Sequence, residues 1–321
     1  AELPSGTVKA ELTNGLVVLL RENHAAPIAI VQVNVKAGSI YEQEYLGSGI
    51  SHLFEHLMHG ATTTTRPEEE QRRILDRIGG QTNASTSYDR TSYYIKTARE
   101  DIGTAIELLA DWMKNASITE KEFDREMQVV QRESERSNAS PQSVFRRLLS
   151  ETMFHVHPAR YPIIGYDEVR AKLRLTDAAA YRARMYVPNN MVVTAVGDFS
   201  WRDVLEKIRK EFEGFPKGAP PAIALPAEPE QVGTRIASRS LPNLNATLFA
   251  LSYPTVRLTH LDLYPLDVLA AVLGRGESSR LVRVIRNERR LVQDITAWSY
   301  TPGFDAGEFT VSAQVPDPDK V

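Results

Sequence analysis

Apolar residues recur with two periods along the first 215 residues, and each period predicts a different kind of element. A period of two over residues 28–37 predicts a strand, and short apolar runs predict further strands at 16–20, 91–97 and 191–196. One face of the strand at 28–37 would carry Ala29, Val31, Val33, Val35 and Ala37. A helical period predicts helices over 67–78, 101–114, 119–137, 142–154, 177–185 and 201–212.

The order of these elements predicts the fold class. Strands and helices follow one another in pairs rather than in strict alternation, which favours an α+β fold with helices packed on a sheet. Composition changes at residues 215–229, FPKGAPPAIALPAEP, which is typical of an extended linker. We expect a first domain at 1–215, a proline-rich linker at 216–230 and a second domain at 231–321 that is shorter than the first.

Charge and composition exclude several classes of function. The chain has 38 basic and 41 acidic residues, a net charge of −3 that gives no general attraction to nucleic acid. The arginine-rich stretch 280–290 is short and interrupted by Glu288, as expected of a solvated helix face. No apolar run is long enough to span a membrane, and no phosphate-binding loop of the ATPase type is present.

The first residues of the chain bear on its compartment. Residues 1–9 do not form an intact signal peptide, although a polar start at Ala1 suits a chain already trimmed on export. We expect a periplasmic or otherwise exported protein, with a cytoplasmic one as the alternative.

The chain has no cysteine, which excludes disulfides and thiolate ligands, so a metal would be held by carboxylates or by some of the 7 histidines.

The segment at residues 48–60, SGISHLFEHLMHG, carries the strongest chemical signal. On a helix its apolar residues form one stripe, while His52, Glu55, His56 and His59 fall on the opposite face. His52 and His56 are one turn apart, so both imidazoles can reach one ion, and Glu55 lies close enough to take a proton from a water beside it. The alternative is a solvated polar face that is rich in histidine.

A tetrahedral zinc would need a third protein ligand. His59 is one candidate, because it lies on the same helical face. The other lies in residues 124–136, where Glu126 and Glu133 share a helical face with two valines and are costly to bury unless they coordinate or pair. Both carboxylates could equally be exposed partners of neighbouring arginines.

Together these residues resemble peptidase family M16, the pitrilysin-like and mitochondrial-processing-peptidase-like enzymes. His52-Leu53-Phe54-Glu55-His56 matches the inverted zinc motif H-x-x-E-H, and Glu133 lies 77 residues after His56, where the family carries its third ligand. The resemblance extends over most of the chain, at Asn14-Gly15-Leu16, Asn83-Ala84, His157-Pro158, Gly165-Tyr166, residues 186–190, residues 196–198, Ser279-Arg280-Leu281 and Arg286.

The resemblance implies a fold, an activity and a cofactor. The fold would be two related α/β-layer domains of the LuxS/MPP-like metallohydrolase type, of which the second appears truncated here. One Zn²⁺ per chain would be bound by His52, His56 and Glu133, with Glu55 as general base and Glu126 orienting a ligand. The activity would be hydrolysis of unstructured peptides in a closed chamber. His59 then falls to a neighbouring polar role.

The resemblance also implies how a substrate and a partner would bind. Residues 83–97 resemble the family's substrate-binding strand, so Asn83 and Ala84 would pair with an extended peptide. The family's far half supplies an arginine and, seven residues later, a tyrosine. Arg286 fits the first position, but residue 293 is Gln. We therefore expect a related M16 subunit to supply that pair in a heterodimer, with a homodimer as the alternative.

Two other functions compete with an active zinc endopeptidase. A scaffold subunit of the same fold would catalyse nothing, but such subunits tend to lose the ligands or the base, and all four residues are present here. A purely structural metal site would use four protein ligands and leave no free base, which Glu55 argues against.

Overall fold

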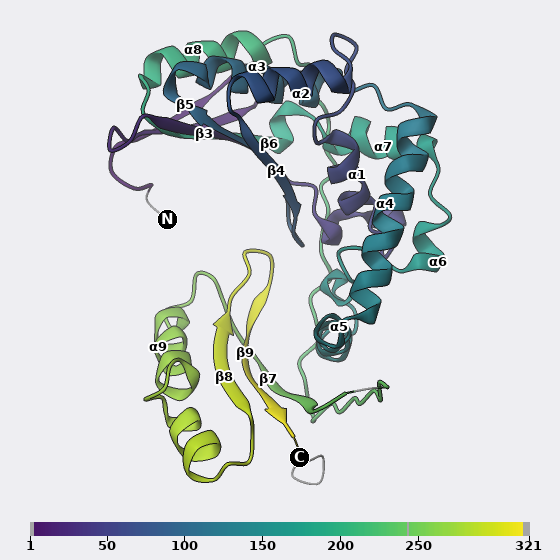
Figure 1. Cartoon of the computed structure of the whole chain (residues 1–321), viewed down its shortest axis with the longest axis vertical. Helices are drawn as coiled ribbons and strands as arrows, with labels where there is room; N and C mark the ends of the chain where they lie inside the picture. Colours follow the sequence, from purple (N-terminus) through teal and green to yellow (C-terminus); the bar gives the residue numbers. More distant parts are fainter. Residues whose placement is uncertain (1–2, 243, 317–321) are drawn as a thin grey trace. The chain divides into compact units, whose positions relative to one another are not determined.

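The computed structural model describes residues 3–242 and 244–316, which divide into two compact units (Figure 1). The first unit contains the chain up to Ser134 together with Tyr161–Leu225. The second contains Glu135–Arg160 together with the chain from Pro226 onward. The segment 135–160 thus packs with the second unit, although it precedes the proline-rich stretch in sequence. The expected assignment of a catalytic domain, linker and second related domain stays a prediction.

A six-stranded sheet forms the centre of the first unit, with the strand order β1-β2-β6-β3-β5-β4. The strands are β1 (Thr7–Glu11), β2 (Val17–Glu22), β3 (Ile28–Val35), β4 (Gln81–Thr86), β5 (Thr91–Ala98) and β6 (Met191–Gly197). Only β2 and β6 pair in parallel, and the other neighbours are antiparallel. The predicted α+β class, with helices packed on a sheet, is confirmed, and the sheet is mostly antiparallel.

Helices cover one face of this sheet, which we call the core face (Figure 1). Alternation along β3 directs Ala29, Val31 and Val33 into this core, where each is at most 2% exposed. Helix α3 packs on β3 and β5, α8 on β2 and α3, and α1 on β4 and β5. The helices of this unit are α1 (Ile50–Met58), α2 (Glu68–Arg77), α3 (Ile102–Asn115), α4 (Glu120–Ala139), α6 (Asp167–Arg170), α7 (Leu175–Met185) and α8 (Trp201–Phe212), of which α4 runs on into the second unit.

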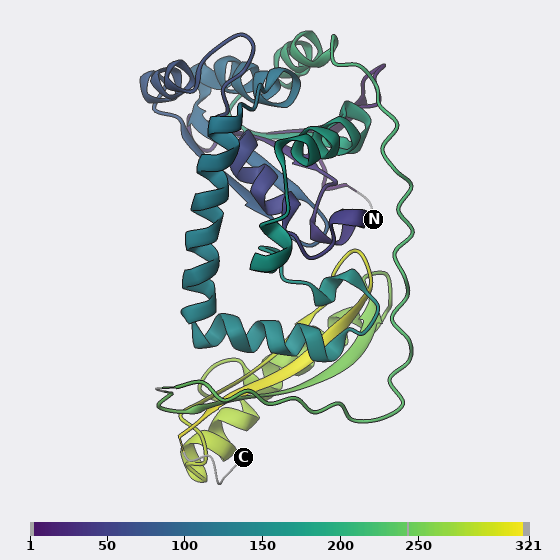
Figure 2. The same cartoon turned by 90° about the vertical axis from the view of Figure 1, so that its right-hand side faces the viewer.

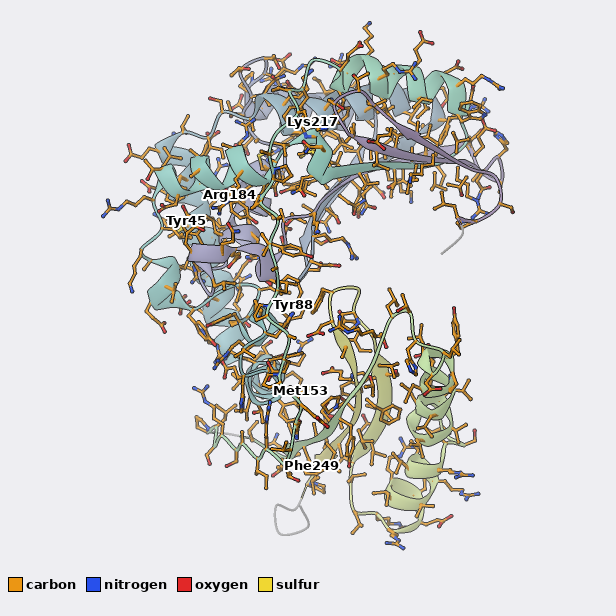
Figure 3. The ribbon with its side chains drawn as sticks, turned by 180° about the vertical axis from the view of Figure 1, so that it is seen from behind. Tyr45, Tyr88, Met153, Arg184, Lys217 and Phe249 are labelled. Carbon is orange, nitrogen blue, oxygen red and sulfur yellow. The ribbon has the colours of Figure 1, made fainter. Side chains whose placement is uncertain are left out.

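Short one-turn helices join these elements, and η2 (Gln43–Tyr45), just before α1, is held by contacts with α7. The others in this unit are η1 (Ser39–Tyr41), η3 (Arg99–Asp101) and η5 (Pro188–Asn190). Arg184 of α7 places its guanidinium over the Tyr45 ring, 5.8 Å from the centroid, and pairs with Glu44 at 2.7 Å (Figure 3). The segment before α1 is therefore tied to α7.

The second unit is built on a three-stranded antiparallel sheet with the order β7-β9-β8. Ile295, Ala313 and Val282 form one buried cluster in it, and Ala270 and Phe309 belong to another. Its elements are α5 (Pro141–Met153), η4 (Pro158–Arg160), β7 (Thr247–Arg257), α9 (Leu263–Gly274), the π-helix η6 (Val282–Glu288), β8 (Asp294–Tyr300) and β9 (Ala306–Val315).

Most of the elements expected from the sequence are present. The strands at 16–20, 28–37, 91–97 and 191–196 are β2, β3, β5 and β6, and the six helices predicted outside residues 48–60 are α2, α3, α4, α5, α7 and α8. Thr119 and Glu122 cap the start of α4 reciprocally, in the arrangement of a capping box. The periodicity gave no prediction for β1, β4 or α6, or for the elements after residue 246. In the described part of the chain, no helix is both long enough and apolar enough to cross a membrane.

Candidate metal centre

Helix α1 has two chemically distinct faces. Ile50, Leu53, Phe54, Leu57 and Met58 are at most 5% exposed and pack into the core. His52, Glu55 and His56 are only partly buried and lie on the other face. Because the apolar stripe fixes the rotation of the helix, the polar residues are held at the rim of the sheet beside β4.

The start of α1 is fixed by backbone contacts and a buried carboxylate. Gly49 has a φ of 70°, and a Cβ there would lie 2.3 Å from the carbonyl oxygen of Ile164, so a side chain has no room. The carboxyl group of Glu42 accepts hydrogen bonds from the backbone N (2.9 Å) and the Oγ (2.6 Å) of Ser51. Burial raises the pKa of Glu42 to about 8. This contact anchors the residue immediately before His52.

Helix α4 runs beside α1 and presents two carboxylates to it (Figure 2). Glu133 Oε2 lies 3.7 Å from Nε2 of His52 and 3.4 Å from Nε2 of His56. One donor atom from each of these three residues lies within 4.8 Å of the other two. Across the described ranges 3–242 and 244–316, this is the only group of three or more such residues that could hold a metal ion.

Glu126 lies two turns before Glu133 on α4 and contacts the far side of His56. Its Oε2 is 3.4 Å from His56 Nδ1, and its Oε1 accepts a hydrogen bond of 2.8 Å from Arg125. Burial opposes ionisation of Glu126, but the hydrogen bonds from His56 and Arg125 lower its pKa. A carboxylate on Nδ1 orients the imidazole and leaves Nε2 toward Glu133, the arrangement that supports a histidine ligand.

The donor set fits zinc. Burial, together with the neighbouring His56, lowers the pKa of His52 to about 4, so this imidazole is neutral at neutral pH and has a lone pair to donate. Two imidazoles and one carboxylate are a known ligand set for catalytic zinc, which keeps a further position open. His52 Nδ1 is buried and has no hydrogen-bond partner within the described residues, so this ring lacks a carboxylate partner of the kind that orients His56.

Glu55 lies beside the three donors but outside their group. Its Oε2 accepts a hydrogen bond of 2.6 Å from Thr86 Oγ1 at the end of β4. Burial raises the pKa of Glu55, while the Thr86 hydrogen bond and His56 oppose the rise. A carboxylate held by one hydroxyl, with its basicity raised, suits proton transfer.

His59 lies apart from the donors because α1 ends at Met58. Its backbone is extended (φ −73°, ψ 104°), so the expected continuation of the helix through residue 59 is wrong. Its Nε2 lies 3.0 Å from Thr82 Oγ1, and its ring meets Trp112 edge to face at 5.7 Å. The group of potential metal donors does not include it.

The residues expected to bind substrate lie in both units. Asn83 and Ala84 lie on β4, which is an edge strand of the described sheet. Arg286 lies in η6, where its guanidinium pairs with Glu277 and its Nε donates to the Asn287 side chain at 3.1 Å. Gln293 donates its backbone N–H to Gln314 in the same unit. The sequence gave no signal for Glu42 or Thr86 as neighbours of the centre, because both contacts depend on tertiary packing.

Two family models and a solved structure match this chain. Residues 17–167 match the family model described as insulinase (peptidase family M16), and residues 172–321 match that of the peptidase M16 inactive domain. The crystal structure of a protease from Helicobacter pylori has a TM-score of 0.87 at 30% identity over 98% of this chain and 75% of that one. The chain belongs to peptidase family M16.

Two curated M16 relatives show how far the likeness reaches. The zinc protease PqqE of Helicobacter pylori is 34% identical over 87% of this chain, and the chain spans 64% of its length. A probable mitochondrial-processing peptidase subunit beta of Arabidopsis thaliana is 29% identical over 82% of this chain and 49% of its own. The M16 chain is therefore a relative of zinc proteases that matches only part of their length.

Proposed function

We propose that this M16 chain is the zinc-bearing part of an endopeptidase that hydrolyses unstructured peptides. The observation that carries the proposal is the convergence of His52, His56 and Glu133 beside a carboxylate, Glu55, that is not one of the three donors. A structural zinc would use four protein ligands. Three donors and a free base instead match a hydrolytic centre.

Each residue has a distinct role in this reaction. His52, His56 and Glu133 hold one Zn²⁺, which when bound supplies Lewis acidity to the scissile carbonyl and to a water. Glu55 takes the water proton and passes it to the leaving amine. Thr86 holds the Glu55 carboxylate in place through its 2.6 Å hydrogen bond. Glu126 keeps the His56 ring oriented through Nδ1.

The substrate binds as an added strand. The support is that β4 is an edge strand and that its last residue, Thr86, contacts the base. Backbone groups of Asn83 and Ala84 pair with an extended peptide, and main-chain pairing of this kind tolerates many side chains. Residues 1–215 form the catalytic domain in this proposal, 216–230 the linker and 231–321 a second related domain.

A related M16 subunit completes the enzyme. Arg286 is the one member of the expected arginine and tyrosine pair that this chain offers, since residue 293 is Gln. One relative is named as a subunit of a processing peptidase, which supports a heterodimer, with a homodimer as the alternative. Peptide hydrolysis at full rate by this chain alone would contradict a need for the partner. An exported location stays a prediction.

The alternative function is a non-catalytic scaffold subunit. The observation that favours it is the match of residues 172–321 to a family model described as an inactive domain. The intact set of His52, Glu55, His56 and Glu133 in the other half favours catalysis.

The test is Glu55→Gln, which removes the base and keeps the shape. We expect hydrolysis of an unstructured fluorogenic peptide, by the chain with its related subunit, to fall at least about 10³-fold. Metal content measured by atomic emission should not change. Lost metal would make Glu55 a ligand, and unchanged hydrolysis would overturn its role as base. A wild-type chain that binds zinc but cleaves no peptide with any related subunit would support the scaffold.

A further inference from the structure

The face of the six-stranded sheet opposite the core face, which we call the open face, has its own charge pattern. Side chains of directly paired residues lie on the same face of a sheet, so the strand registers define its composition. Three cations lie on it, Lys9, Arg21 and Lys96, against one carboxylate, Glu11. Among the described residues, none of the three cations has an ion pair within 4.0 Å.

One row across the open face combines these cations with apolar side chains. Arg21 of β2 pairs with Val196 of β6, Val196 with Ile30 of β3, and Ile30 with Lys96 of β5. Two aliphatic residues are thus flanked by a cation on each side. The rows nearer Thr86 are polar and uncharged on β3, β5 and β4, with Gln32, Tyr94, Asn83, Asn34, Ser92 and Ser85.

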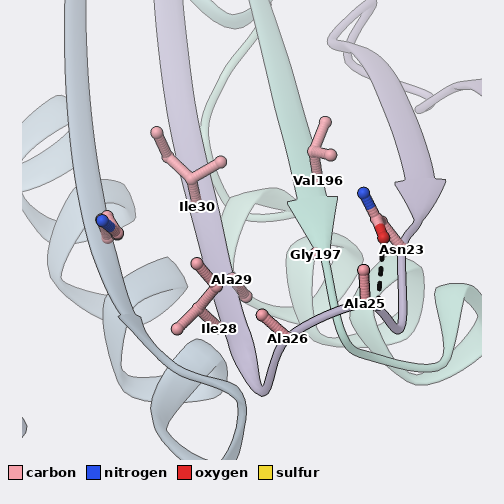
Figure 4. Close-up of a pocket in the computed structure, with 9 residues that line it drawn as sticks. Asn23, Ala25, Ala26, Ile28, Ala29, Ile30, Val196 and Gly197 are labelled. Carbon is pink, nitrogen blue, oxygen red and sulfur yellow. Dashed lines mark hydrogen bonds between the residues drawn. The ribbon is translucent and has the colours of Figure 1, made fainter.

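A pocket opens at this row (Figure 4). Its volume is about 250 Å³, and Ile28, Ile30, Val196 and Lys96 contribute to its lining. Ile28 and Val196 remain 45% and 41% exposed, which is high for large aliphatic side chains on a sheet. The pocket therefore offers an apolar hollow with a free ammonium group at its wall.

The distance from the candidate metal centre matches a peptide chain. Thr86, which contacts Glu55, is five residues along β4 from Gln81, and Gln81 pairs with Lys96. Five residues of strand and the two strand spacings from β4 to β3 together separate the pocket from Thr86 by about 20 Å. An extended peptide covers this distance in roughly six residues.

We propose that this row, Arg21, Val196, Ile30 and Lys96, is a second binding site for the peptide substrate. It takes a segment in which an aliphatic or aromatic side chain is next to acidic residues, about six residues from the scissile bond. The apolar side chain fills the pocket, and the carboxylates pair with Arg21 and Lys96. The site rests on the proposed function, because it shares its substrate with the metal centre.

The experiment compares three peptides with one cleavable core. One is the core alone, the second adds at both ends a six-residue arm ending in Leu-Glu-Glu, and the third ends the arms in Leu-Lys-Lys. We expect KM for the acidic peptide to be roughly 5- to 30-fold below that for the basic one, with kcat within about twofold, because two exposed ion pairs replace two like-charge contacts while the leucine contact is the same in both. At high salt the difference should shrink.

Variants connect the preference to the row. Arg21→Glu combined with Lys96→Glu should reverse the order of the two KM values. Lys210→Glu is the matched control, because Lys210 is an exposed cation on α8, on the other side of the sheet, and should change nothing. Equal KM values for all peptides, or a preference that survives in the double variant, would overturn the site.

Binding without turnover separates this site from the proposed function. Anisotropy of the labelled peptides on Glu55→Gln measures affinity whether or not the chain cleaves. Tighter binding of the acidic peptide that depends on Arg21 and Lys96, without hydrolysis by wild type, would support the site and contradict the peptidase. Hydrolysis with no charge preference in binding would contradict the site alone.

Discussion

The two faces of the six-stranded sheet share the same strands but differ in composition. The core face is mostly apolar and almost fully buried, as at Leu20 and Val33, and α1, α3 and α8 pack on it. The open face carries cations, amides and half-exposed aliphatics, and side chains such as Leu19 are only partly buried. The core face holds α1 in position, and with it the metal donors. Because the open face is less buried, we expect less of the stability to depend on it.

The largest effect expected from this comparison is on stability. Leu19 and Leu20 are identical neighbours on β2 that point to opposite faces. Leu20→Ala should cost about 2–5 kcal/mol, because it empties a fully buried position, whereas Leu19→Ala, at a partly buried position, should cost about 1–2 kcal/mol. Urea unfolding of the two variants measures both values. Similar costs for the two variants would contradict the conclusion that the core face contributes more to stability than the open face.

A smaller effect concerns the carboxylate that anchors α1. The pKa of Glu42 is about 8 in the folded protein, against an ordinary value of 4.5, because the group is buried. Between these values the folded protein holds a proton that the unfolded chain has released, so its stability falls as the pH rises. Glu42→Gln keeps a neutral acceptor for Ser51 and removes this dependence.

We therefore expect wild type to lose up to about 3 kcal/mol relative to Glu42→Gln between pH 5.5 and 8. Urea unfolding at several pH values measures the difference. Parallel curves for the two proteins would mean that Glu42 is already ionised in the fold, with its charge compensated by hydrogen bonds.

Much of the fold was predictable because local periodicity reflects burial. Alternation at 28–37 identified the core face of β3, and the helical stripe at 50–58 placed His52, Glu55 and His56 on one side. The register between strands was not predictable. The row from Arg21 to Lys96 crosses β2, β6, β3 and β5, whose order in the sheet differs from their order along the chain, and no local pattern encodes their pairing.

Some residues of the candidate site were likewise predictable from local spacing, and others were not. The spacing of His52 and His56 predicts a metal pair by itself, whereas Glu133 and His59 were both open as the third ligand until the family resemblance was considered. The structure brings Glu133 to 3.4 Å from His56 and turns His59 away. The contacts of Glu42 with Ser51 and of Thr86 with Glu55 join separate elements, so only the fold reveals them.

Zinc titration of the metal-free chain, followed by calorimetry, tests the central claim most directly. We predict one equivalent of tightly bound zinc for wild type and for Glu55→Gln. Binding should be at least about 100-fold weaker for Glu133→Gln, and roughly 10- to 100-fold weaker for Glu126→Gln, which only orients His56. Wild-type affinity in Glu133→Gln, or no bound zinc in the wild-type chain, would contradict the assignment of His52, His56 and Glu133 as the metal centre.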